Sequence, residues 1–307
     1  MGIIFGPVIS RRFGKSLGID LSPNKKQCNY DCIYCELKPA KQIDKYSDIV
    51  PPEKIIQECK DALDIYKDID VVTVTANGEP TLYPYLYEIA KGIKALQTSS
   101  KLLILSNGST ITDNDTIKAL EVFDIVKLSF DCATQRCFKR IDRAKSGISI
   151  DDIKEGMLKF RKNFSNTLII EVLIVENIND KKDEIEKIDQ FLLKLNPDRV
   201  DLSTIDRPPA YDVKPLSYKK LFELSQIFDP SLHIHIASRQ NISSIEKESY
   251  TKERILDTLA KRPLTDRDIE LLMDKASIEV LKELLIEGKV EKIEKFGIFF
   301  YILSKNS

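Results

Sequence analysis

Short apolar runs alternate with helical patterns over most of the chain. The runs are rich in Val, Ile and Leu and lack the polar alternation of a half-exposed strand, as expected for strands that are covered on both faces. The predicted strands are residues 16–21, 71–76, 101–106, 125–130, 167–175 and 199–204. The clearest helical stretches between them are 51–66, 85–97, 149–164 and 181–196.

Six alternations of strand and helix predict an α/β fold. Helix-entry residues support two of the helices, since Pro51, Pro52 and Glu53 precede one and Ser149 precedes another. The alternation predicts a parallel sheet with helices on its outside, either an open sheet or a partial barrel. In such folds the reactive groups gather at the carboxyl ends of the strands.

Polar and glycine-containing stretches directly follow most of the predicted strands. These stretches are Asn77-Gly78-Glu79-Pro80, Asn107-Gly108, Asp131 and Asp206-Arg207-Pro208-Pro209. Gly and Asn permit turns that bring backbone amides close to a ligand. Because β–α loops are rich in such residues generally, the set as a whole, and no single loop, indicates a site.

The pattern changes after about residue 240. Three predicted helices, roughly 251–261, 264–274 and 277–287, are followed by a hairpin that turns around 295–297. This order is typical of a winged helix, and the polar stretch 237–249 is a plausible linker. We therefore predict a main domain over 1–240 and a winged-helix-like domain over 241–307.

The charge of the C-terminal domain does not settle what it binds. Its third helix carries only Lys282 and Lys289 among several acids, which is poor for phosphate binding. A protein-docking module, or a cover for the active site, fits equally well. Lysines around the hairpin (Lys292, Lys295 and Lys305) leave contact with tRNA as a further alternative.

Composition is that of an ordinary globular protein. The 307 residues have room for one large domain and an appendage, and 47 Lys+Arg balance 48 Asp+Glu. No stretch reaches the ~18 apolar residues of a membrane helix. The apolar start precedes its Arg pair, the reverse of a signal peptide. We expect a cytoplasmic location, where clustered cysteines are ligands or reactive thiols more often than bridges.

Cys28, Cys32 and Cys35 form a C-x3-C-x2-C cluster, which holds three of the six cysteines. Three thiolates leave one iron of a four-iron cluster without a protein ligand. A structural zinc site is the alternative, but it needs four ligands. The other candidates are scattered along the chain: Cys59, Cys132, Cys137, His233 and His235.

The cysteine spacing, with the aromatic Tyr34 before the third cysteine, resembles the radical S-adenosylmethionine (SAM) superfamily. The segments "NGEPTLYP" (77–84), "LSNG" (105–108) and "KLSFD" (127–131) extend the resemblance in order and spacing. It implies a partial (βα)6 barrel over about residues 5–240, a [4Fe-4S] cluster and SAM. One electron from a donor such as flavodoxin or ferredoxin would cleave SAM and release a 5′-deoxyadenosyl radical, which abstracts hydrogen from a substrate.

The resemblance also implies roles for individual residues. The three cysteines would bind the cluster, and Tyr34 would lie against the adenine of SAM. The remaining implied SAM contacts are Gly78 with Glu79 and Pro80 at the methionine ammonium, Ser129 near the ribose or carboxylate, and Asn107 and Asp131 at the same mouth.

Each implied SAM contact also has an ordinary structural explanation. Tyr34 would pack within its loop, Ser129 would be a buried strand serine, and Asp131 would cap the next helix. Glu79 and Pro80 would be plain turn residues.

Within the superfamily, the chain is most similar to the wyosine-base-synthase-like group of small iron–sulfur oxidoreductases. The shared segments are "GPVISRRFGKSLGIDLSP", "GEPTLYP", "KRIDRA" and "IDRPPA". Named members join carbons from pyruvate to a tRNA guanosine and carry further cysteines upstream of the triad. Residues 1–27 here contain none. The resemblance therefore implies the superfamily chemistry, with a tRNA nucleoside, a peptide or a small metabolite as substrate.

Five arginines are candidate substrate contacts, because guanidinium groups bind carboxylate or phosphate in a bidentate manner. They are Arg11, Arg12, Arg140, Arg143 and Arg207. Arg140 and Arg143 would share a helix face, and any of the five could instead be a surface residue. Cys132 and Cys137 are either substrate-facing thiols or, more commonly, small apolar residues.

A different class of function also fits the cysteines and the C-terminal pattern. An iron–sulfur or zinc-containing regulator would use a winged helix on nucleic acid. Such a regulator needs no six-stranded sheet with loops that converge on a SAM-sized pocket, so the β–α part favours the enzyme.

Overall fold

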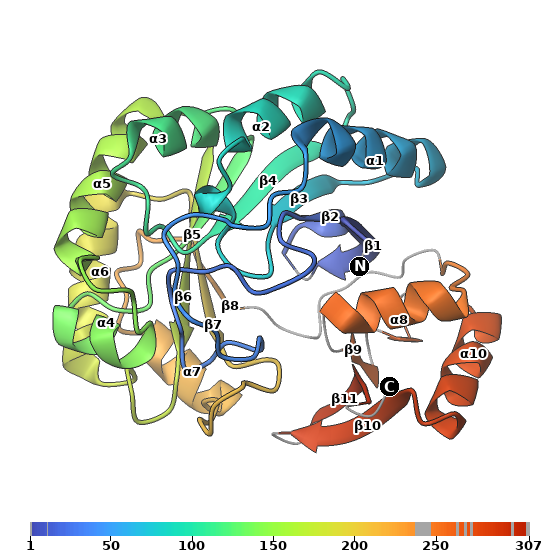
Figure 1. Ribbon diagram of the computed structural model, residues 1–307. Coiled ribbons are helices and arrows are strands. Elements are labelled where there is room, and N and C mark those ends of the chain that lie inside the picture. Colours follow the sequence, from blue (N-terminus) through green and yellow to red (C-terminus); the bar gives the residue numbers. More distant parts are fainter. Residues whose placement is uncertain are drawn as a thin grey trace.

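A computed structural model describes residues 2–10, 12–236, 247–261, 264–266, 269–270, 273–295 and 298–304. Its largest element is an eight-stranded sheet in which the strands follow one another in chain order (Figure 1). The strands are β1 (Ile4–Ser10), β2 (Gly14–Asp20), β3 (Val71–Thr75), β4 (Lys101–Ser106), β5 (Ile125–Ser129), β6 (Thr167–Ile174), β7 (Arg199–Thr204) and β8 (Ile234–Ile236).

Strands β2 to β8 are parallel, and only β1 in this sheet runs antiparallel to its neighbour. The predicted α/β fold with a parallel sheet is confirmed. The sequence pattern missed β1, because Gly6 and Pro7 interrupt its apolar run. Pro cannot donate to a β-ladder but is tolerated on an edge strand, which is where β1 lies.

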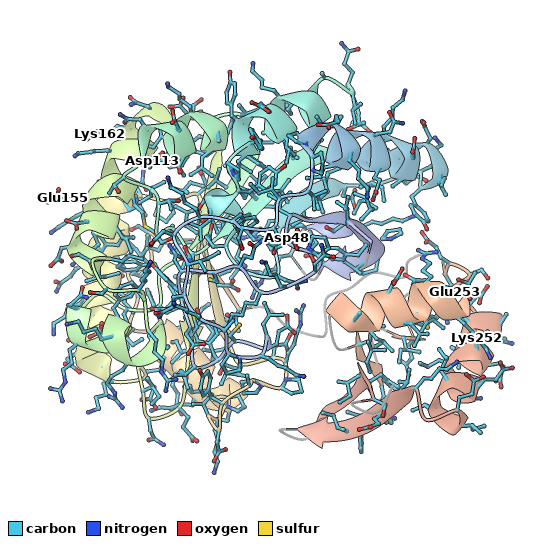
Figure 2. The ribbon with its side chains drawn as sticks, viewed as in Figure 1. Asp48, Asp113, Glu155, Lys162, Lys252 and Glu253 are labelled. Atoms are coloured by element: carbon cyan, nitrogen blue, oxygen red, sulfur yellow. A yellow bond between two sulfur atoms is a disulfide. The ribbon has the colours of Figure 1, made fainter. Side chains whose placement is uncertain are left out.

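Helices surround the sheet (Figure 1). They are α1 (Pro52–Ile65), α2 (Leu86–Lys94), α3 (Asn114–Leu120), α4 (Gln135–Ile141), α5 (Ile150–Asn163), α6 (Lys182–Leu195) and α7 (Tyr218–Ser225), with a short 3-10 turn at Pro80–Leu82. All four predicted helices are confirmed within a few residues. Ser149 caps α5 by accepting a hydrogen bond from the amide of Asp151. Glu155 and Lys162 of α5 project outward from the helical layer (Figure 2).

The two faces of the sheet have different cores, because successive strand residues point to opposite sides. The helix-covered face belongs to the main core, with Val126, Leu128, Ile170 and Val172 among its members. The inner face has a separate small apolar cluster of Val71, Leu103, Ile125 and Ile169, against which Phe13 packs. Above this cluster the inner face carries charged residues, which barrel interiors usually lack.

The C-terminal residues form a second, smaller structure. Its elements are α8 (Lys252–Lys261), β9 (Leu264–Thr265), α10 (Lys275–Ile286), β10 (Val290–Lys295) and β11 (Ile298–Leu303), and its sheet order is β10-β11-β9. The predicted hairpin is confirmed, since β10 pairs with β11. The predicted start of the helix 264–274 was wrong, because Leu264 and Thr265 pair with Tyr301 and Phe300 of β11, whereas the described residues Asp266, Ile269 and Glu270 are helical.

The C-terminal structure packs against β1. Ile9 of β1 joins the apolar cluster that contains Tyr250, Ile255 and Leu284. The Tyr250 hydroxyl donates to the carbonyl of Pro7 at 2.9 Å. Covering an edge strand in this way removes a template for unwanted strand pairing. The predicted boundary at 240/241 and most of the linker 237–249 lie outside the described residues, and the division into two domains stays a prediction.

Replacing Tyr250 with Phe tests this junction. The variant keeps the buried ring but leaves the Pro7 carbonyl without its donor, which costs about 1–3 kcal/mol of unfolding free energy. Urea denaturation measures the loss. Tyr87→Phe is the control, because Tyr87 is an exposed residue of α2. Equal stability of both variants would contradict a stabilising role for this hydrogen bond.

No helix within the described part of the chain combines the length and the apolar character needed to cross a membrane.

Candidate active site

The three cysteines of the C-x3-C-x2-C cluster lie on the long loop between β2 and α1. Cys28, Cys32 and Cys35 are half-buried and unbridged. Backbone hydrogen bonds fasten their loop to the loops after β3 and β7 and to the end of α4. These bonds join the Gln27 amide to the Asn77 carbonyl (2.8 Å), the Ile33 amide to the Ile141 carbonyl (2.9 Å) and the Ala210 amide to the Cys35 carbonyl (2.8 Å).

The environment of the thiols fits a bound metal. Burial raises the pKa of Cys28 to about 12, and it also raises the pKa values of Cys32 and Cys35. Thiolates at these positions therefore need a bound cation to offset their charge.

The loop after β3 packs directly beneath the cysteine loop. Gly78 has φ +144°, and a Cβ atom there would lie 1.8 Å from the carbonyl oxygen of Gln27. The amide of Glu79 donates to that same carbonyl at 2.9 Å. Only glycine allows the two backbones to approach so closely.

Glu79 is 1% exposed, and its carboxylate holds several loops together. Its Oε1 accepts from the Thr81 amide (3.0 Å), the Thr81 hydroxyl (2.7 Å) and the Ser106 hydroxyl (2.7 Å), and its Oε2 accepts from the Asn107 amide (2.7 Å). Burial raises the pKa of Glu79, and these donors oppose the shift. Glu79 is thus more than a plain turn residue, because it fixes the loop after β3 to the loop after β4.

Tyr34 joins the cysteine loop to the end of β5. Its hydroxyl donates to Asp131 Oδ2 at 2.5 Å and lies 3.5 Å from Asp142 Oδ1. Asp131 Oδ1 accepts from the Leu173 amide at 2.7 Å. Asp131 is not the cap of α4, because the Thr134 side chain fills that position.

A small cavity lies beside these residues. Its polar lining comes from Tyr30, Asn107, Ser129, Asp131 and Asp142. The Tyr30 hydroxyl is buried and has no hydrogen-bond partner among the described residues. Burial raises the pKa of Asp131 to about 7, and burial together with the Asp131 charge raises that of Asp142. The structure therefore brings Asn107, Ser129 and Asp131 together next to the cysteine loop.

Residues 26–192 match the family model described as the Radical SAM superfamily, and these residues include all three clustered cysteines and β3 to β6. The chain belongs to the radical SAM superfamily. It is accordingly an enzyme, and the fold implies SAM and an iron–sulfur cluster as cofactors. The cysteine loop offers the thiols that such a cluster requires.

Relatives and solved structures agree with this assignment. A "UPF0026 protein" of Helicobacter pylori (strain J99) is 42% identical over 96% of this chain and 95% of its own length. A UPF0026 protein of Methanocaldococcus jannaschii is 30% identical over 98% of this chain and 96% of its own length. A solved structure of TYW1 with a lysine–pyruvate adduct bound has the same fold, with a TM-score of 0.54, 18% identity and coverage of 73% of this chain and 74% of that chain.

The arginines that were predicted to contact substrate in this radical SAM enzyme are spread over different surroundings. Arg12 reaches the inner face of the sheet, where it pairs with Glu171. Arg207 pairs with Glu36 of the cysteine loop. Arg140 is exposed on α4. Arg11 lies outside the described residues.

The prediction that Arg140 and Arg143 share a helix face was wrong. Helix α4 ends at Ile141, and Arg143 follows it with a φ of +45°. The Arg143 guanidinium instead stacks over the Tyr211 ring at 4.5 Å. The Tyr211 hydroxyl donates to Asp31, which lies beside Cys32 in the sequence.

Cys132 and Cys137 form a disulfide, which the sequence reasoning did not expect. Their Cα atoms are 5.6 Å apart because α4 begins between them and turns the chain back. The carboxylate of Glu184 lies next to this pair, and it accepts hydrogen bonds from the amides of Ala133 and Thr134.

Several site residues were missed. Asp142 lies in the segment "KRIDRA", but nothing in the local sequence pattern shows that its side chain lies next to the cysteine loop. Lys127, Glu171 and Asp201 had a usable signal. Each is a charged residue inside an otherwise largely apolar strand, and each is exposed by less than a quarter of its side-chain surface.

The charge of Glu171 predicts a pH effect on stability. Burial opposes its ionisation, but Arg12 and Lys127 outweigh burial and lower the pKa to about 2 from an ordinary 4.5. A carboxylate with a lowered folded-state pKa stabilises the protein above pH 4.5, and this contribution disappears as the pH falls towards 2.

Glu171→Gln should therefore weaken the dependence of the unfolding free energy on pH in this window. Denaturant unfolding at several pH values between about 5 and 3 measures the slope. Glu155→Gln, at an exposed position of α5, controls for the loss of one carboxylate. A Glu171→Gln slope as steep as that of the wild type would contradict the prediction.

Proposed function

We propose that this enzyme binds a [4Fe-4S] cluster through Cys28, Cys32 and Cys35 and uses it to cleave SAM reductively. The chemistry that the cluster supplies is one-electron cleavage of SAM to a 5′-deoxyadenosyl radical, which abstracts hydrogen from the substrate. The observation that carries the proposal is the convergence of three half-buried, unbridged thiols with the loop after β3 at the carboxyl edge of a parallel sheet.

The residues around the thiols are assigned to SAM. The backbone at Gly78 meets the methionine end, on a loop that Glu79 holds rigid. Tyr34 lies against the adenine, while Asn107, Ser129 and Asp131 face the ribose and the carboxylate. These last three residues line one small cavity together with Tyr30, which supports the assignment because it brings their polar atoms together beside the cysteine loop.

A tRNA nucleoside is the substrate that we favour. The support is the similarity of several segments to the wyosine-base-synthase-like group; the pyruvate reaction of that group is not part of the proposal, because residues 1–27 hold none of its further cysteines. The C-terminal structure, which we interpret as winged-helix-like, would contact the tRNA or a protein partner. Flavodoxin or ferredoxin would supply electrons in the cytoplasm.

Anaerobic reconstitution with iron and sulfide, followed by reduction with dithionite, tests the SAM chemistry. The expected product is 5′-deoxyadenosine, detected by liquid chromatography and mass spectrometry. A protein that takes up zinc, forms no cluster and makes no 5′-deoxyadenosine would support the regulator alternative instead.

The substrate needs a separate experiment. Mass spectrometry of tRNA nucleosides from a deletion strain and its parent should show one modified nucleoside missing or replaced by its precursor. An unchanged profile would overturn the tRNA proposal and leave peptides or small metabolites.

A further inference from the structure

A layer of charged side chains lies on the inner face of the sheet, beside the residues assigned to SAM. We propose that this layer binds an oxyanion of the substrate, a carboxylate or a phosphate, through Arg12 and Lys127. The inference rests on the proposed function, because it places the substrate next to the SAM site and names the group by which it is held.

Strand register places the layer. Ser129, Glu171, Asp201 and His235 are successive partners across β5, β6, β7 and β8, so they form one row on one face of the sheet. Lys127 lies two residues before Ser129 on β5 and shares its face. Glu171 and Asp201 therefore stand level with the proposed SAM contact Ser129, and Lys127 lies just below it, on the face where a substrate would meet the radical.

The exposure pattern shows that the inner face is not filled at this level. On β6, Glu171 and Leu173 are half-buried, whereas Ile170 and Val172 on the helix-covered face are fully buried. The side chains of Arg12 and Glu171 are 16% and 22% exposed. Below them, Phe13 and its apolar cluster close the inner face. Arg12 and Glu171 therefore keep some exposed surface above the apolar cluster, and Lys127 is buried beside them with 6% of its side chain exposed.

Ion pairs tie the cations of this layer to its carboxylates. Arg199 holds Asp201 with two contacts of 2.7 and 3.1 Å, whereas Arg12 Nε approaches the same carboxylate only at 3.5 Å. Arg12 and Lys127 both bind the Glu171 carboxylate, one on each oxygen, with Lys127 at 2.6 Å. The Asp131 carboxylate above them also interacts electrostatically with Lys127.

The donors suit an oxyanion. A guanidinium offers five N–H donors and an ammonium three, and the described contacts of Arg12 and Lys127 use only part of this capacity. The ion pairs with Glu171 show that Arg12 and Lys127 can bind one carboxylate at the same time. A buried charged layer is costly to maintain, and perturbed charges of this kind cluster at functional sites.

The test uses the full-length, cluster-reconstituted protein with saturating SAM, and inorganic phosphate and acetate as separate probes. Calorimetric titration should show binding of at least one probe to the wild type, with a Kd at least tenfold weaker in Arg12→Gln and Lys127→Met. Arg12→Lys should recover part of the affinity, because it restores the charge. Lys118→Gln, at an exposed position of α3, is the control for the loss of one cation and should bind like the wild type.

The outcomes separate this inference from the proposed function. Phosphate binding alone indicates a phosphate-bearing substrate, and acetate binding alone indicates a carboxylate; binding of both supports the shared oxyanion chemistry. Binding of neither probe, or equal binding by variants that retain the wild-type circular dichroism, overturns the inference. Failure of the proposed function would appear instead as missing 5′-deoxyadenosine in the wild-type sample.

Discussion

Cys32→Ser should abolish measurable production of 5′-deoxyadenosine. We expect the rate to fall by at least about 100-fold, which is more than the loss caused by removing a residue that only hydrogen-bonds to a metal ligand. Iron–sulfur clusters bind thiolate sulfur, and a serine oxygen is a much poorer ligand for them. With only three cysteines on the loop, losing one leaves two anchors. Iron and sulfide content, visible absorbance and 5′-deoxyadenosine formation together measure the effect.

Cys59→Ala is the matched control. Cys59 is a free cysteine that is fully buried on α1, and its environment contains only the apolar core. Its truncation should cost roughly 1 kcal/mol of stability through the lost packing and leave the iron content unchanged. Wild-type 5′-deoxyadenosine formation by Cys32→Ser would refute the cluster assignment.

Gly78→Ala should both destabilise the protein and weaken SAM binding. The new Cβ atom would lie 1.8 Å from the Gln27 carbonyl oxygen and 2.3 Å from its carbon, and both are backbone atoms that cannot rotate away. The two loops must separate, which breaks the hydrogen bonds between Glu79 and Gln27 and between Gln27 and Asn77. We expect a loss of about 3–5 kcal/mol, in the range of the most damaging substitutions.

Gly147→Ala separates this clash from simple backbone strain. Gly147 also has a positive φ, +94°, but a Cβ atom there would meet nothing within 4 Å. Its substitution should cost about 1–3 kcal/mol from strain alone and leave SAM binding intact. Denaturant unfolding and SAM titration of both reconstituted variants make the comparison. Equal losses of stability and of SAM affinity in the two variants would show that the close approach of the loops at Gly78 contributes to neither.

Local sequence patterns were sufficient to predict the helices and strands that bury one continuous apolar stripe or run. Strands β2 to β7 and the longer helices α1, α5 and α6 are of this kind, since each carries its own periodicity. The patterns failed at β1, β8 and β9. The apolar run of β1 is interrupted, and β8 and β9 are short strands whose partners lie more than 25 residues away in the sequence, so no local window contains their pairing.

The candidate site divides in a similar way. The cysteine spacing and Gly78 could be recognised because cluster binding and a tight turn need particular residues at fixed separations. Three features could not be recognised from the sequence: the path of Arg143 after α4, the contact between Tyr34 and Asp131, and the disulfide of Cys132 and Cys137. These depend on where a helix ends and on which loops meet across the sheet.

By itself, the sequence determined the alternation of strands and helices, the three thiols and the order of the loops that follow the strands. These properties are local, because hydrophobic periodicity and ligand spacing act over a few residues. Only the tertiary structure decided that Arg12, Lys127, Glu171 and Asp201 share one layer and that Glu79 ties its loop to the next one. Their side chains come from separate strands and turns, and only the folded sheet brings the charges close enough to interact.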